Sequence, residues 1–280
     1  MSDKNRRGWQ GIWDQYYDAI IAFGLYLVVY IPILVWMWDR WWAADSYYSH
    51  GILVPFFSGF LVWQQKETLA KIKRKRVPFG FVLIVIGLLV YLAASSFRIY
   101  SISGFSMLIV LAGIILYFFG WAIFKVIWFP FTFLFFMMPL PLFIIRNISF
   151  QMKMFAARLS TFILNNIGLI AVQQGSLIKM PHAFVTVDDV CSGLRSLISL
   201  TALGSVVAYL MKGHYMKRVI LFLSTIPIAI ITNMCRIVFL AFVSEVWGAE
   251  YVEGAIHDIS GYMVFALAFI LLMGTGKLLE

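Results

Sequence analysis

Long apolar runs that end at charged or aromatic residues constrain this chain more than any other feature. A helix needs about 20 mostly apolar residues to cross a bilayer, because each residue rises about 1.5 Å. Eight runs meet or approach this length, at residues 19–38, 51–63, 79–96, 101–120, 126–145, 193–211, 219–243 and 257–273. We therefore expect an all-α polytopic membrane protein, a single integral membrane domain over residues 1–280 with about eight transmembrane helices.

The composition favours lipid as the main solvent of the chain. Hydrophobic residues make up 62% and charged residues only 12% of the sequence, and soluble domains carry about twice that charge. The net charge of +9 comes from short basic blocks between the apolar runs, a pattern that indicates membrane topology and not a face for nucleic acid. We expect the lipid bilayer as a partner and no nucleic acid.

The basic blocks predict an orientation. The densest block lies between Lys66 and Arg76, so the loop after the second span is expected on the cytoplasmic side. Counting crossings from this loop makes residues 1–18 a cytoplasmic tail and residues 146–190 an extracytoplasmic segment. In that segment, polar positions recur on one side of residues 146–171, as in an amphipathic helix on the outer surface. Residues 176–180 and 183–189 alternate like a small hairpin.

Three chemically active residues reach the same outer depth in this topology. Cys191 precedes the sixth span, His257 begins the eighth, and Arg236 lies 17 residues beyond Val219 in the seventh, about 25 Å above the inner surface. The positive end of a helix dipole stabilises the thiolate form of a cysteine at the helix start, and the thiolate is the nucleophile. An arginine stabilises a developing oxyanion, and a histidine exchanges protons near neutrality. The trio is therefore a candidate catalytic site for acyl transfer.

Neighbouring polar residues are candidate supports, each with a structural alternative. Asn233 lies one turn before Arg236, and Arg195 follows Cys191 by four residues as either a second site cation or a headgroup anchor. Asp189 is a polar residue two positions before Cys191. His50 either approaches the site or only begins the second span.

The cysteines and histidines also allow other interpretations. Cys235 is interpreted as a packing residue, although a disulfide between Cys191 and Cys235 remains an alternative. Zinc bound by Cys191, His50 and His257 is disfavoured, because no pair among them has a short ligand spacing. We expect no metal and no cofactor.

At these residues the chain resembles the exosortase and archaeosortase family. The similar stretches are VDDVCSGLRS at 187–196, NMCR at 233–236, HDISGYMVF at 257–265, SHGILVP at 49–55 and PLP at 139–141. Together they extend over most of residues 47–273. The histidine at the third catalytic position is more similar to the bacterial exosortases than to the archaeal relatives.

The resemblance implies a thiol protease or transpeptidase of the cytoplasmic (inner) membrane that sorts proteins at the periplasmic face. Its partners would be membrane-anchored substrate proteins with a C-terminal sorting signal of the PEP-CTERM type, in an organism that makes exopolysaccharide. It assigns Cys191 as nucleophile, Arg236 as transition-state stabiliser and His257 as general base. Two alternatives remain: a transporter or flippase for envelope polysaccharide precursors, in which Arg236 and Arg195 bind phosphate, or a non-catalytic envelope assembly partner.

Overall fold

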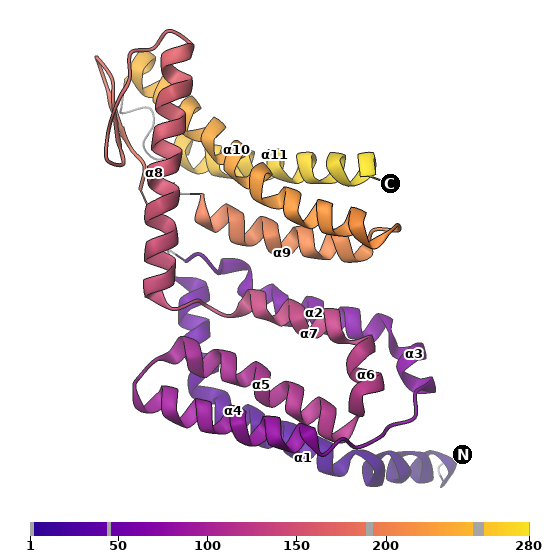
Figure 1. Ribbon diagram of the computed structural model, residues 1–280. Helices are drawn as coiled ribbons and strands as arrows, with labels where there is room; N and C mark the ends of the chain where they lie inside the picture. The colour runs from indigo at the N-terminus through magenta and orange to yellow at the C-terminus, as the bar shows by residue number, and fades with distance from the viewer. Residues whose placement is uncertain (1–2, 44–45, 189–192, 249–254, 280) are drawn as a thin grey trace. The chain divides into compact units, whose positions relative to one another are not determined.

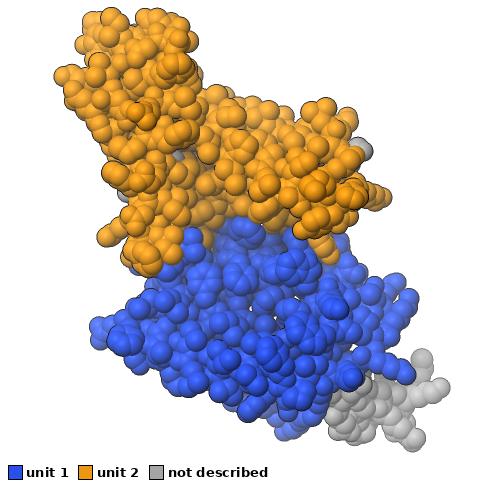
Figure 2. Space-filling view, in the orientation of Figure 1, with its two compact units in different colours: residues 1–43, 49–141 blue, residues 44–48, 142–280 orange. Residues whose placement is uncertain are grey.

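The computed structural model describes residues 3–43, 46–188, 193–248 and 255–279, with side chains for residues 17–248 and 259–279 of these ranges. The chain divides into two compact units (Figures 1 and 2). Unit 1 comprises Met1–Ala43 and Ser49–Pro141, and unit 2 comprises Ala44–Tyr48 and Leu142–Glu280. The single domain expected from the sequence stays a prediction.

Unit 1 is built from helices only, among the residues described. In chain order they are α1 (Asp3–Trp42), η1 (Ser49–Ile52), α2 (Leu53–Gln64), α3 (Lys66–Lys71), α4 (Phe79–Ser96), α5 (Tyr100–Phe118), α6 (Gly120–Val126), α7 (Trp128–Phe133) and η2 (Leu134–Met137). The expected cytoplasmic tail, residues 1–18, is thus largely the beginning of the long helix α1.

Helices α4 and α5 form the closest helix pair of unit 1. A Cβ atom placed on Gly80 would lie 2.3 Å from the backbone nitrogen of Tyr117, and one on Gly113 would lie 2.7 Å from the carbonyl oxygen of Gly80. Only glycine permits this close approach of the two backbones. Membrane helices commonly pack through such small residues, because the hydrophobic effect does not drive helices together within lipid.

The outer face of α4 is strongly apolar. Phe81, Leu89 and Leu92 are each more than half exposed, whereas a soluble protein avoids contiguous apolar surface of this kind. Lipid chains can cover this apolar surface without exposing it to water. The structure therefore agrees with a membrane-embedded protein.

Unit 2 combines one crossing helix, a small sheet and a three-helix bundle. Its elements are α8 (Leu142–Asn166), β1 (Val172–Gln174), β2 (Leu177–Lys179), β3 (Phe184–Thr186), α9 (Leu194–Leu210), α10 (Tyr215–Trp247) and α11 (Ala255–Leu279). Helix α10 packs against both α9 and α11. Figure 1 shows α8 running across one end of this bundle, where α9 and α11 begin and α10 ends.

The segment between α8 and α9 differs in detail from the expected hairpin. Strand β2 pairs antiparallel with both β1 and β3, in the order β1-β2-β3, with Ile178 opposite Gln173 and Val185. The expected hairpin strands therefore correspond to β2 and β3, and β1 adds a third strand. The predicted surface helix corresponds to α8, which begins and ends a few residues earlier than residues 146–171.

Five helices of the described chain are long and apolar enough to cross a membrane, and six if one bent pair counts as a single span. They are Tyr17–Trp42 of α1, α4, α5, α10 and Ile259–Leu279 of α11. Helix α9, with 17 residues, and α2, with 12, are shorter. The all-α polytopic membrane class is confirmed, and the count of eight spans stays a prediction.

The span expected over residues 126–145, with an interruption at Pro139 and Pro141 near its end, is broken earlier in the structure. The chain bends by 69° between α6 and the segment Trp128–Met137, and residues 142–145 already belong to α8. Pro130 explains the break, because it has no N–H to bond the carbonyl of Val126 and fits only the first turn of a new helix. Helix α6 accordingly ends at Val126, and α7 starts at Trp128.

Candidate functional site

Asn233 and Arg236 form the polar centre of unit 2. Both lie on α10, three residues apart, so they share one face of the helix. Asn233 is only 4% exposed, and Arg236 is half-buried. A guanidinium held inside a membrane protein is a functional candidate by default, because burying its charge in lipid is costly.

The start of α9 rests on Asn233. Gly193 is the N-cap residue of α9, with φ at +81°, a left-handed conformation that residues with a Cβ rarely adopt. A Cβ atom placed on Gly193 would lie 2.8 Å from Nδ2 of Asn233. Two features therefore require glycine at this position: the left-handed backbone angle, and the lack of space for a Cβ atom beside the Asn233 amide.

The start of α11 is bonded to Arg236. Its Nε donates a hydrogen bond of 2.9 Å to Oγ of Ser260, which is 4% exposed. A Cβ atom on Gly261 would lie 3.7 Å from an Nη atom of the same guanidinium. The bond through Nε fixes the plane of the guanidinium, because the arginine fork is rigid.

The chain that precedes residues 189–192 is also anchored to α10. Val187 is 1% exposed and packs in a hydrophobic cluster with Ile237 and Ala241 of α10 and residues of α8 and the sheet. Its N–H donates to the carbonyl of Ser176. The carboxylate of Glu245, near the end of α10, accepts the N–H of His182 at 3.2 Å. The chain is therefore tied to α10 both before and after residues 189–192.

A small cavity of about 220 Å³ adjoins the site. It lies between α8 and α10, and its lining residues are Gln151, Met152, Phe155, Ala156, Ile230, Asn233 and Met234. Ligand pockets for whole small molecules are larger, at about 300 Å³ and above. This cavity has room for a single apolar side chain beside Asn233.

The structure brings together part of the expected constellation. Asn233 and Arg236 lie in the site, and Arg195 is in the first turn of α9, with its Nε shielded from solvent. Cys191, Asp189 and the side chain of His257 lie outside the described residues. Their roles, and that of Arg195, stay predictions.

The remaining expected residues fall elsewhere. His50 belongs to η1 of unit 1, where its side chain bonds to the backbone of Phe136, so its part in the site stays a prediction. Cys235 is a free and exposed thiol in the part of the chain that the structure describes. Among the side chains that the structure describes, no three His, Cys, Asp or Glu gather as metal ligands.

Gly193 and Ser260 were not assigned site roles from the sequence. Ser260 carried one usable signal, because it follows His257 by three residues and therefore shares its helix face. Gly193 carried another, since a glycine at a helix start permits left-handed backbone.

Replacing Gly193 by alanine is expected to destabilise the fold more than replacing Gly168 does. Both glycines have a left-handed φ, but a Cβ on Gly168 meets nothing within 4 Å. Both variants lose about 1–2 kcal/mol to backbone strain, and Gly193→Ala loses roughly 1–3 kcal/mol more by crowding Asn233. Thermal unfolding of the purified protein measures the difference. Equal destabilisation would show that the Asn233 contact contributes nothing.

The fold and this site define a polytopic helical membrane protein with an arginine-bearing site at one end of a helix bundle. A family profile described as transmembrane exosortase matches residues 41–274. The match covers most of the chain, which therefore belongs to the transmembrane exosortase family, and the resemblance stated from the sequence is confirmed. No curated protein and no solved structure matches the chain.

Proposed function

We propose that this exosortase-family protein is a membrane-embedded cysteine transpeptidase or protease. It cleaves C-terminal sorting signals of the PEP-CTERM type from membrane-anchored proteins at the outer face of the cytoplasmic membrane. The observation that carries the proposal is the pair of contacts made by one face of α10, from Asn233 to Gly193 and from Arg236 to Ser260.

These two contacts limit how far the proposed nucleophile and base can lie from α10, because both are only a few residues from a contact. Cys191 is two residues from Gly193, and two extended residues span about 7 Å at most. His257 precedes Ser260 by three residues, which is close to one turn of α11. One face of α10 therefore contacts two short chain segments: Asn233 contacts the segment that carries the Cys191 thiol, and Arg236 bonds to the segment that carries the His257 imidazole.

The proposed reaction has two acyl-transfer steps. The Cys191 thiol gives its proton to His257, and the sulfur attacks the scissile carbonyl carbon while the Arg236 guanidinium stabilises the oxyanion. The C–N bond then breaks, and His257 protonates the leaving amine. A thioester remains on Cys191. An acceptor amine resolves it to a new amide, or water resolves it to a carboxylic acid, and either route restores the thiol.

The predicted orientation suits a substrate held by a single helix. Basic residues of that substrate's tail stay on the cytoplasmic side, so its sorting signal emerges just outside the bilayer. Our predicted topology assigns the ends of α9, α10 and α11 that carry the site to this outer level. The cavity beside Asn233 would receive one apolar side chain of the signal.

Cleavage of a reporter in cells tests the proposal. The reporter carries a soluble domain followed by a sorting signal, one transmembrane helix and a basic tail, and its matched control carries the same residues with the signal scrambled. We expect the intact chain to release the soluble domain from the first reporter only. Equal release from both, or from neither, would overturn the proposal.

A further inference from the structure

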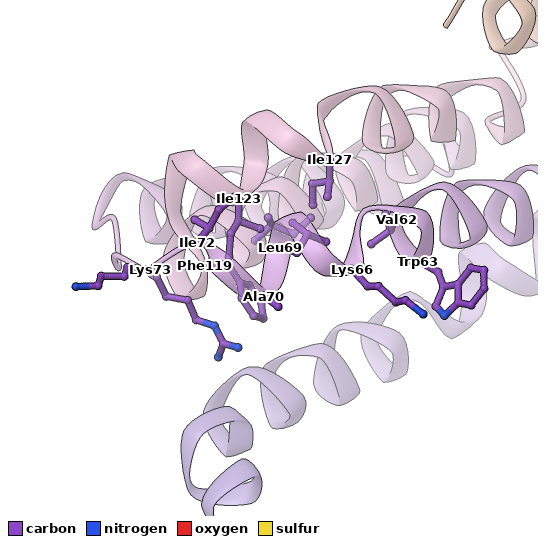
Figure 3. A pocket seen from close by; sticks show the side chains of 12 residues that line it. Val62, Trp63, Lys66, Leu69, Ala70, Ile72, Lys73, Phe119, Ile123 and Ile127 are labelled. Carbon is purple, nitrogen blue, oxygen red and sulfur yellow. The ribbon is translucent and has the colours of Figure 1, made fainter. Parts of the chain in front are cut away.

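Unit 1 contains a cavity of about 1000 Å³ with a cationic rim. It is bounded by α2, α3, α5 and α6 and the basic segment that follows α3. Lys66, Lys73 and Arg74 are its charged lining residues, and the nine others are apolar, so none of the described residues that line it is acidic. Figure 3 shows Ile72, Ile123 and other apolar side chains gathered in the middle, with Lys73 at one end and Lys66 toward the other.

Aromatic side chains hold two of these cations in place. The Nζ atom of Lys66 lies 4.6 Å from the centre of the Trp63 ring, and the guanidinium of Arg74 lies 5.4 Å from that of Phe119. Cation–π contacts of this kind orient a charge without neutralising it. An exposed ion pair of 3.0 Å between Arg76 and Asp18 further attaches the basic segment to α1. Two of the three rim cations, Lys66 and Arg74, are therefore oriented by aromatic rings.

The cationic cavity continues into an apolar groove. Val62, Ile115, Phe119 and Ile127 line both this cavity and a second one of about 660 Å³ between α1, α2, α5 and α7. The lining of the second cavity contains no charged residue among those described. The two cavities therefore adjoin, and together they offer a cationic end and an apolar end.

We propose that this space binds an anionic phospholipid, with the phosphate at Lys66, Lys73 and Arg74 and an acyl chain in the groove. In a bilayer, an apolar groove that faces lipid takes up hydrocarbon, and a cationic rim beside it selects a negative headgroup. The transmembrane helix of a sorting substrate is a poorer occupant, because its basic tail meets three positive charges. Lipid bound in this space would be independent of the proposed cleavage reaction.

Retention of lipid by the full-length protein tests the site. Native mass spectrometry would follow release from nanodiscs that contain equal amounts of phosphatidylglycerol and phosphatidylcholine. We expect the wild-type protein to retain phosphatidylglycerol over phosphatidylcholine by about tenfold or more. The variant Lys66→Gln/Lys73→Gln/Arg74→Gln should lose that preference, while Lys71→Gln/Lys75→Gln/Lys125→Gln, which removes the same charge outside the lining, should keep it.

A second variant tests the apolar end without changing charge. A Cβ atom on Gly59 would meet nothing within 4 Å, so Gly59→Trp fills the groove that Gly59 lines. We expect it to reduce retention of phosphatidylglycerol severalfold in a protein that remains monodisperse. Equal retention of both lipids by the wild type, or equal losses in the two charge variants, would overturn the proposal. So would displacement of the lipid by excess inorganic phosphate or by a transmembrane peptide with a basic tail.

Discussion

Replacing Cys191 by alanine is expected to abolish cleavage of the signal-bearing reporter. The thiol is the only group in the proposed reaction that bonds to the substrate, and loss of a nucleophile lowers turnover by about 10⁴-fold or more. The protein should still accumulate in the membrane, since Asn233 still meets Gly193 and Arg236 still bonds to Ser260 in this variant. Immunoblotting of the reporter and of the protein measures both quantities.

Cys235 provides the matched control for this experiment. It is the second of the two cysteines, and it is free and exposed on α10, so Cys235→Ala should cleave the reporter at the wild-type rate. Full cleavage by Cys191→Ala would contradict the transpeptidase and leave the transporter or the assembly partner. Both of these tolerate the loss of the thiol.

Replacing Arg236 by lysine is expected to lower the cleavage rate by about 10²–10³-fold, the loss typical of removing one oxyanion donor. Lysine keeps the positive charge but lacks the planar fork and the Nε that bonds to Ser260. The geometry of the donor, and not its charge alone, should therefore determine the rate. Reporter cleavage over time, at equal protein levels, gives this ratio.

Arg158 supplies the control for the arginine exchange. It is exposed on α8 in the same unit, so Arg158→Lys should cleave as the wild type does. An Arg236→Lys protein with unchanged cleavage would contradict the oxyanion role. That result would fit a phosphate-binding cation, because either side chain supplies the charge.

The spans were predictable where hydropathy alone decides the structure. Helix α4 coincides with the expected residues 79–96, and α5 differs by one residue at its start and two at its end. Residues 126–145 were misjudged because a hydropathy window does not register a proline's missing N–H. Pro130 divides that run into two helices, and the chain later enters α8.

The depth of the candidate site stays a prediction, and its lateral arrangement was not predictable from the sequence. Counting residues along each span places Arg236 at the level where α9 and α11 begin, and Figure 1 shows these helix ends at the same end of unit 2. Which face of α10 meets which neighbour depends on packing between helices far apart in sequence. The contacts with Gly193 and Ser260 therefore emerged only from the structure.

The mass of the acyl-enzyme tests most directly whether Cys191 is the nucleophile. The purified protein would be incubated with a signal peptide, quenched with acid and digested, and the peptide that contains Cys191 would be weighed. We predict an added mass equal to the acyl part of the cleaved signal, on Cys191 only and released by hydroxylamine as a thioester is. Cleavage of the peptide with no adduct on Cys191, or with the adduct on another residue, would show that Cys191 is not the nucleophile.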